Sequence, residues 1–272
     1  MAGRTMRVLF IGDVVGRPGR EAVRTLVPEL RSEYELDVVI ANAENSAGGL
    51  GATPKTLMEL TDAGVDAITL GNHAWKKKEL VGAIDSLPNV VRPSNFPQGN
   101  PGRGQMLVET AAGPLGLINV QGRVFMGPLD CPFAAAERGV VSFAGQTSAI
   151  VVDFHAEATS EKIAMGWFLD GSVSAVLGSH THVQTADERI LPGGTAYITD
   201  VGMTGPEDSV LGINRALVVR QMRTRMPQKF EVARTRPWLA GVVVAIDAGT
   251  GRATHIERLN RPVPDGAVGS AG

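Results

Sequence analysis

Four of the five histidines in this 272-residue chain stand at or just past the ends of short apolar runs, in company with asparagine and acidic residues. Such runs are typical of β-strands, and in an α/β protein the carboxyl ends of the strands meet at one crevice where ligands bind. Carboxylate, amide and imidazole groups are metal ligands, and a set this large can hold two ions. The candidate ligands are Asp13, Glu44, Asn45, Asn72, His155, His180 and His182. The pattern predicts a hydrolase with two metal ions.

The stretch NAENSAGGLGAT places a glycine-rich segment directly after two of these candidates. Glu44 offers two oxygens and can bridge a pair of cations, and Asn45 can coordinate one of them as a neutral ligand. Glycine lets the backbone approach a ligand closely, so Ser46, Gly48 and Gly49 are the candidate substrate contacts. The alternative is an ordinary tight turn that needs glycine for positive φ.

The histidine-containing strings GNH (71–73) and GSHTH (178–182) each follow an apolar run. His180 and His182 are two residues apart, so an extended strand would point them to opposite faces, whereas a turn just past the strand can aim both inward. His73 has no assigned metal and is free to act as a general acid. His255 lies in the late run RATHIERL and is interpreted as structural.

The string IGDVVGRPGR contains three glycines but matches neither G-x-G-x-x-G nor G-x-x-x-x-G-K-[ST]. A dinucleotide site or a P-loop is therefore not indicated. Asp13 in this string has an alternative interpretation as the N-cap of the following helix. The other ligand types at strand ends favour the metal interpretation.

Short β-branched runs alternate with segments of helical spacing along the chain, and this βαβ series favours a largely parallel sheet. The segments expected to be helical are 20–34, 54–63, 76–87 and 159–169. The segments expected to be strands are 6–12, 37–43, 66–72, 148–155, 172–180, 195–201 and 241–247.

The middle and the end of the chain have a different pattern. Residues 89–104 are rich in Pro, Asn and Gly and are expected to form a long loop, and 104–122 reads as a hairpin. Residues 252–259 are expected to pair with the preceding strand, and about 262–272 to form a flexible tail. No repeat or linker is visible, so we expect one α/β domain over residues 1–272, with two βαβ-like halves forming two packed sheets and helices outside.

The composition is that of an ordinary globular protein, with 43% apolar and 20% charged residues. A net charge of −2 gives no electrostatic case for duplex nucleic acid or an anionic membrane. The single cysteine, Cys131, excludes an intramolecular disulfide, suits a reducing cytosol and is expected to be a small buried hydrophobe. No run approaches the roughly 20 apolar residues of a membrane span, and the first run is too short for a secretory signal. We therefore expect a cytoplasmic protein.

The strand-end motifs resemble the ordered motif series of calcineurin-like metallophosphoesterases. The closer resemblance is to the YmdB-like bacterial branch, over about residues 8–205, through the strings GDVVGRPGR, NAENSAGG, LGNHAW, DFHAEATSEK, GSHTHVQTAD and DVGMTG. This resemblance implies a four-layer α-β-β-α sandwich with a dinuclear centre between the loops of two packed sheets. It also implies phosphodiester hydrolysis, with 2′,3′-cyclic nucleotides as substrates and iron, or manganese, as the metal.

The chain departs from the wider superfamily at three positions, all of which resemble the YmdB-like pattern. Val15 stands where the usual D-x-H opening has its histidine, which removes one metal ligand. Asn45 could replace that ligand. Glu44 takes the bridging place of the usual G-D-x-x-D motif. Ala74 follows GNH where an acid is common, which removes a possible orienting partner of His73.

The proposed ligand sets are Asp13, Asn45 and His182 for one ion and Asn72, His155 and His180 for the other. Glu44 would bridge the two, a shared hydroxide would attack phosphorus, and His73 would protonate the departing alkoxide. The oxygen and nitrogen ligands do not select one metal, and Zn and Co also fit.

Two other classes of function remain open at this point. One is a metal- and nucleotide-binding regulatory protein with slow or no turnover, and the other is a scaffold protein with incidental polar loops. The complete ligand set favours the enzyme, acting on a small nucleotide phosphodiester. A homo-oligomer is possible.

Overall fold

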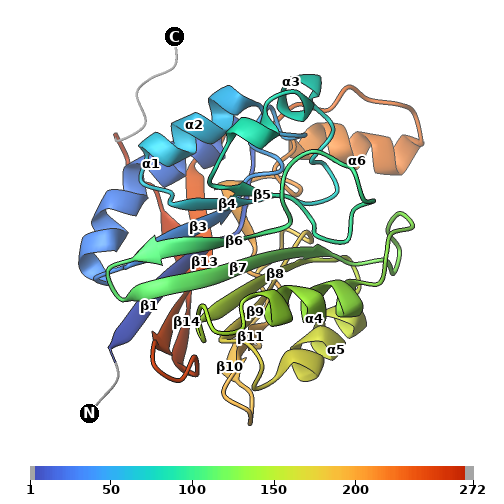
Figure 1. Cartoon of the computed structure of the whole chain (residues 1–272). Coiled ribbons are helices and arrows are strands. Elements are labelled where there is room, and N and C mark those ends of the chain that lie inside the picture. Colours follow the sequence, from blue (N-terminus) through green and yellow to red (C-terminus); the bar gives the residue numbers. More distant parts are fainter. Residues whose placement is uncertain (1–3, 267–272) are drawn as a thin grey trace.

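The computed structural model describes residues 4–266 and contains two β-sheets packed against each other (Figure 1). The first sheet has the strand order β2-β12-β13-β1-β3-β4-β5, with β14 also paired to β13. Its strands are β1 (Thr5–Ile11), β2 (Asp13–Val14), β3 (Val38–Asn42), β4 (Ala67–Thr69), β5 (Val90–Val91), β12 (Met203–Pro206), β13 (Pro237–Asp247) and β14 (Ala253–Pro262).

The second sheet has the order β10-β11-β9-β8-β7-β6. Its strands are β6 (Gln105–Thr110), β7 (Gly113–Gln121), β8 (Ile150–His155), β9 (Ala175–Ser179), β10 (Arg189–Ile190) and β11 (Ala196–Ile198). The helices are α1 (Gly16–Glu33), α2 (Pro54–Asp62), α3 (Lys78–Val81), α4 (Pro132–Ser142), α5 (Thr159–Leu169) and α6 (Arg215–Thr224). Helices α1 and α2 lie outside the first sheet, and α4 and α5 lie outside the second (Figure 1).

The alternation of side chains along β1 shows how the layers are held together. Val8 and Phe10 are fully buried in the cluster that also contains Leu117 of the second sheet. Leu9 and Ile11 point to the other face and pack in the cluster formed with α1. Because successive side chains of a strand point to opposite faces, one apolar run supplies both the interior between the sheets and the helix-covered face. The α-β-β-α sandwich is confirmed, and we propose on this basis that the chain folds as one domain.

The expected parallel pairing is present in both sheets. The strands β1, β3, β4 and β5 pair in parallel, as do β7, β8, β9 and β11. Segment 104–122 forms the expected hairpin of β6 and β7, and β14 pairs with β13. The carboxyl ends of both parallel sets lie at the same edge of the sandwich, because the backbone N–H of His180, just past β9, donates to Asp13, just past β1.

Several predicted helix boundaries were wrong. The first helix begins at Gly16, four residues before the expected start, and the helix expected over 76–87 reduces to α3 and a 3₁₀ turn over Ile84–Ser86. In that segment only Leu80 and Ile84 are buried among the helical residues, which is too little apolar contact to hold a long helix in place. Helices α4 and α6 had not been predicted.

The predicted tail was wrong at its start. Strand β14 continues to Pro262, and Val263 is buried with its N–H donated to the carbonyl of Pro237 at 2.9 Å. Residues 267–272 lie outside the described part of the chain. Cys131 is half-buried at the start of α4 rather than fully buried, and His255 is exposed on β14, away from the carboxyl ends of the parallel strands. Among the described residues, no helix is both long and apolar enough to cross a membrane.

Candidate metal centre

The first sheet brings three of its strand ends to one level. Ile11 pairs with Ala41 and Asn42 pairs with Thr69, so the residues two to four positions further along each strand lie close together. These residues are Asp13, the Glu44-Asn45 pair and the Asn72-His73 pair. Asp13, Glu44 and Asn45 are almost completely buried. The parallel register therefore brings these candidates to one level, and the pairing of β2 with β12 also holds Asp13 there.

The second sheet contributes histidines from two neighbouring strands. His155 is the last residue of β8 and is fully buried, and β9 ends one residue before His180. His180 and His182 both have positive φ, +100° and +64°. This left-handed turn is how two histidines two residues apart both point toward the cluster. Each such residue costs about 1–3 kcal/mol of strain that the surroundings must offset.

One group of ligand atoms surrounds His155 Nε2. This nitrogen lies 2.9 Å from Asn72 Oδ1, 3.1 Å from His180 Nδ1 and 3.3 Å from Glu44 Oε1. Glu44, His155 and His180 each offer a ligand atom, all within 4.8 Å of one another. Electron-pair donors that converge so closely are the arrangement that a cation stabilises.

A second group lies next to the first. His182 Nε2 is 3.2 Å from the amide nitrogen of Asn45 and 3.7 Å from Asp13 Oδ1. Ligation by Asn45 would need its amide turned over, so that the oxygen faces this group. Asp13 Oδ2 accepts the backbone N–H of His180 at 3.0 Å, which ties the two sheets together. Asp13 Oδ1 is buried and has no hydrogen-bond partner among the described residues. Buried polar atoms in proteins almost always have a partner, and a bound metal ion would supply one for this oxygen.

The hydrogen bonds behind His155 orient its ring. The hydroxyl of Ser179 donates to Asp153 Oδ1 at 2.6 Å. The hydroxyl oxygen of Ser179 also lies 2.9 Å from His155 Nδ1. Since the single hydroxyl proton of Ser179 goes to Asp153, His155 Nδ1 must carry the proton that Ser179 accepts. The lone pair of Nε2 is then directed at the cluster, as metal ligation requires.

The electrostatics of the cluster favour a cation. Burial raises the pKa of Asp13. Burial would also raise the pKa of Glu44, but the charge and hydrogen bonds of His155 and His73 hold it well below its usual value. Burial opposes charging of His155, yet the carboxylate of Glu44 raises its pKa to about 9, so without metal the ring also carries a proton on Nε2. A bound ion would take the place of that proton and use the same lone pair. Burial and the neighbouring His155 lower the pKa of His180 to about 3, which keeps that imidazole neutral and able to ligate.

His73 lies beside the cluster and is held by it. Its backbone N–H donates to Glu44 Oε2 at 2.7 Å, and its Nδ1 lies 2.7 Å from Asn45 Oδ1 and 3.0 Å from Glu44 Oε1. A quarter of the side chain is exposed. These contacts engage Nδ1, which leaves Nε2 as the ring atom for a substrate. The glycine of the GNH motif is required by space, because a Cβ on Gly71 would overlap His155 and Glu44.

The glycine-rich loop is a tight turn. Gly48, Gly49 and Gly51 all have positive φ, as the alternative interpretation required. Ser46 is fully buried, with its hydroxyl 3.0 Å from Thr56 of α2, so its side chain is engaged within the protein. Gly48 is exposed, and no atom lies within 4 Å of the position that a Cβ would occupy there. The part of the loop open to a substrate is therefore around Gly48.

A buried ion pair supports the turn that carries the two strained histidines. Lys162 of α5 and Asp200 are 1% and 0% exposed and lie 2.6 Å apart. Asp200 Oδ2 also accepts the backbone N–H of Thr181 at 3.0 Å and its hydroxyl at 2.7 Å. Thr181 stands between His180 and His182, so this pair holds both ligands in place.

These supporting residues were not predicted. Asp153 had a signal, because it lies two residues before His155 and therefore on the same face of the strand. Lys162 and Asp200 are 38 residues apart and had no local signal. The alternative role of Asp13 as a helix cap is not seen, since Val15 occupies that position and makes no side-chain cap.

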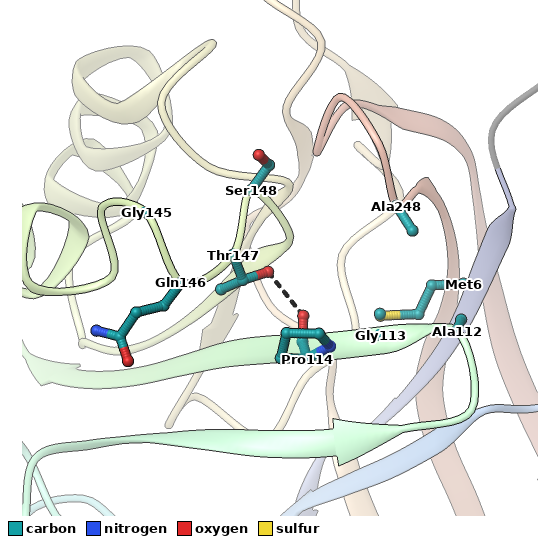
Figure 2. Close-up of a pocket in the computed structure, with 9 residues that line it drawn as sticks. All are labelled: Met6, Ala112, Gly113, Pro114, Gly145, Gln146, Thr147, Ser148 and Ala248. Carbon is teal, nitrogen blue, oxygen red and sulfur yellow. Dashed lines mark hydrogen bonds between the residues drawn. The ribbon is translucent and has the colours of Figure 1, made fainter.

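A hollow in the surface lies at the other end of the sandwich. Figure 2 shows this cavity of about 350 Å³ near the amino ends of β1 and β7, lined by Met6, Ala112, Gly113, Pro114, Gly145, Gln146, Thr147, Ser148 and Ala248. No charged side chain lines it. The convergent polar groups of the molecule are at the opposite edge.

The comparison with protein families decides the assignment. A family profile described as "YmdB-like protein" matches residues 9–259. The chain belongs to the YmdB-like family. It is 53% identical over 254 residues to the 2′,3′-cyclic-nucleotide 2′-phosphodiesterase of Bacillus subtilis (strain 168), covering 93% of this chain and 96% of that protein.

Two solved structures of similar sequence superpose on nearly the whole chain. A hypothetical protein from Thermus thermophilus has a TM-score of 0.89 and 43% identity, over 95% of this chain and 100% of its own. A novel phosphatase from Mycoplasma pneumoniae has a TM-score of 0.89 and 34% identity, over 97% and 96%. The resemblance to metallophosphoesterases is confirmed, and with it the prediction of a phosphoester hydrolase at the level of enzyme class.

Proposed function

We propose that the chain is a dinuclear-metal-dependent phosphodiesterase that hydrolyses 2′,3′-cyclic nucleotides. The observation that supports this most directly is the buried, unpartnered Asp13 Oδ1 within a set of seven converging ligands. The name of the Bacillus subtilis relative supports the substrate class. Two ions bound here would activate water and neutralise charge on the phosphoryl oxygens.

The proposed ligand sets are Asp13, Asn45 and His182 for one ion and Asn72, His155 and His180 for the other, with Glu44 shared. Ser179 and Asp153 keep the lone pair of His155 Nε2 directed inward. Asp200 and Lys162 hold the turn of the second-sheet histidines. Iron is the metal that the family suggests, with manganese able to support activity.

His73 is the proposed general acid. Hydrolysis at the 2′ ester forms a bond from the water oxygen to phosphorus and breaks the bond from phosphorus to O2′. The departing O2′ needs a proton, and we propose that His73 Nε2 donates it while Nδ1 stays bonded to Asn45; the contact of Nδ1 with Asn45 supports this role. The backbone around Gly48 is the proposed contact for phosphate or ribose.

Elemental analysis of the reconstituted protein, with hydrolysis of cyclic nucleotides, tests this function. We expect about two ions per chain and release of a nucleoside 3′-phosphate. One ion or none would contradict the shared centre. Bound metal and nucleotide without turnover would favour the alternative, a regulatory binding protein. The cytoplasmic location and the homo-oligomeric state also stay predictions.

A further inference from the structure

We infer that the substrates of this centre include RNA fragments that end in a 2′,3′-cyclic phosphate, held by a basic arm formed by residues 211–236. This inference rests on the proposed function and specifies its substrate class. A 2′,3′-cyclic phosphate forms when the 2′-hydroxyl of an RNA attacks the adjacent phosphodiester and expels the next 5′-oxygen. The group is therefore the 3′ end of an RNA fragment before any mononucleotide is released from it.

The basic arm concentrates positive charge in an otherwise acidic chain. It contains seven cations and one acid, Glu231, a net of +6, so the rest of the chain carries −8 of the total −2. All seven cations are exposed: Arg215, Arg220, Arg223, Arg225, Lys229, Arg234 and Arg236. Among the described residues, only Arg215 and Arg236 of this set have a carboxylate within salt-bridge distance. A surface of this kind attracts a polyanion.

Apolar side chains are interleaved with these cations. Helix α6 buries only Val218, and Val219, Met222, Met226 and Phe230 are each exposed by 45% or more. Unpaired bases stack on aromatic rings and on arginine guanidinium planes, so Phe230 and the arginines can hold bases while the cations contact the backbone phosphates. In a symmetric contact between two copies of this chain, one basic arm would face the other. Repulsion between the two arms disfavours self-association through this surface.

One end of the arm contacts a proposed metal ligand, and the segment near the other end packs beside the glycine-rich loop. The carbonyl of Leu211 lies 3.2 Å from His182 Nδ1. The side chain of Val232 packs against Gly16 and Gly49, beside the loop that carries the exposed Gly48. Between these contacts, α6 stands at the margin of the molecule, apart from the two sheets (Figure 1). An RNA whose 3′ end occupies the centre would place its remaining phosphates along the arm.

The test compares two substrates on the full-length, metal-loaded protein. One is a five-nucleotide RNA ending in a 2′,3′-cyclic phosphate, and the other is the matching cyclic mononucleotide. We expect kcat/KM to be at least about 10-fold higher for the RNA at low salt and to fall as salt rises. With three phosphate contacts at ~0.7 each for single strands, the log–log salt slope should be steeper by roughly 2 for the RNA.

A charge-reversed arm variant and a matched control separate the arm from total charge. Arg220→Glu, Arg223→Glu and Arg225→Glu together should remove the preference for RNA and flatten its salt slope, while mononucleotide hydrolysis continues. The control changes three exposed cations on other helices, Arg24→Glu, Lys55→Glu and Arg138→Glu, and should keep the preference.

Three outcomes would overturn the inference. The first is wild-type protein that hydrolyses the RNA no better than the mononucleotide. The second is an arm variant that loses both activities equally. The third is an arm variant that changes oligomeric mass without a selective loss on RNA, which would make the arm a contact between copies.

If neither substrate is hydrolysed, the proposed function has failed and the arm is judged separately. Fluorescence anisotropy of a labelled five-nucleotide RNA then measures binding alone. The arm variant must bind this RNA more weakly than the control variant. Equal binding by the two variants would reject the arm as an RNA site.

Discussion

The two sheets hold their metal-ligand candidates in different ways. In the first sheet, Glu44 and Asn45 follow a strand on a short turn closed by local bonds, such as the N–H of Ser46 to the carbonyl of Ala43 at 3.1 Å. In the second sheet, His180 and His182 sit in a left-handed turn. That turn depends on a buried ion pair contributed by α5 and by the segment after β11.

The difference shows two ways to position a metal ligand: by the register of neighbouring strands, or by hydrogen bonds from side chains elsewhere in the fold. A parallel register brings the strand-end residues of the first sheet to one level, and Asp13 is also held by the pairing of β2 with β12. The strained turn of the second sheet needs an external acceptor, because a non-glycine residue at positive φ costs about 1–3 kcal/mol. Mutation of a ligand in the first sheet should therefore abolish metal binding. Mutation of a residue that supports the second-sheet turn should weaken metal binding without abolishing it.

The largest effect is expected from Glu44→Gln. This change removes the charge shared by both proposed ion sites, so both occupancies and all activity above background should be lost. Elemental analysis measures the occupancy. Glu59→Gln, an isosteric change on the exposed side of α2, should retain both ions. A Glu44→Gln protein that keeps one ion at full occupancy would show that Glu44 does not bridge.

His73→Ala is expected to have the next largest effect. Loss of a general acid lowers turnover by roughly 10²–10⁴-fold, and the metal content should stay intact. The loss should be much smaller on a nitrophenyl phosphodiester, because nitrophenolate departs without a proton. Similar losses on both substrate types would mean that His73 only supports the GNH turn. Loss of metal together with activity would make His73 a ligand. His255→Ala is the control.

Asp200→Ala tests the support of the second-sheet turn. It leaves Lys162 buried without its partner, which should destabilise the fold by about 3–5 kcal/mol in denaturant unfolding. The double change Asp200→Leu with Lys162→Met removes both charges and should recover most of that stability. It still lacks the acceptor for Thr181, so metal affinity should remain roughly 10–100-fold weaker. Wild-type affinity in the double variant would show that the turn holds without Asp200.

The smallest effect is expected from Ser179→Ala. His155 then loses the acceptor of its Nδ1 proton, and metal affinity should fall by about 10-fold, the lower end for a group that orients a ligand. Ser174→Ala removes an equally buried hydroxyl that bonds to Ile150 and Gly251 instead, and should leave affinity unchanged. Equal losses in the two variants would point to a general packing defect.

Much of this protein was determined by local sequence. Apolar runs marked the strands, and the polar residue after each run marked the cluster, because strand ends of a parallel sheet meet at one edge. Helix α5 was predicted at its observed bounds, Thr159–Leu169. The alternation along β1 carried both the interior between the sheets and the helix-covered face.

Only the tertiary structure decided how the second-sheet histidines are aimed. Their turn depends on Lys162 and Asp200, and the backbone of His180 is bonded to Asp13 across 167 residues. The segment 76–87 had helical spacing but too little buried surface to form one helix, and Val263 joined the core through a bond to Pro237. Such outcomes are set by partners that fold into place from far along the chain, and a local pattern carries no information about them.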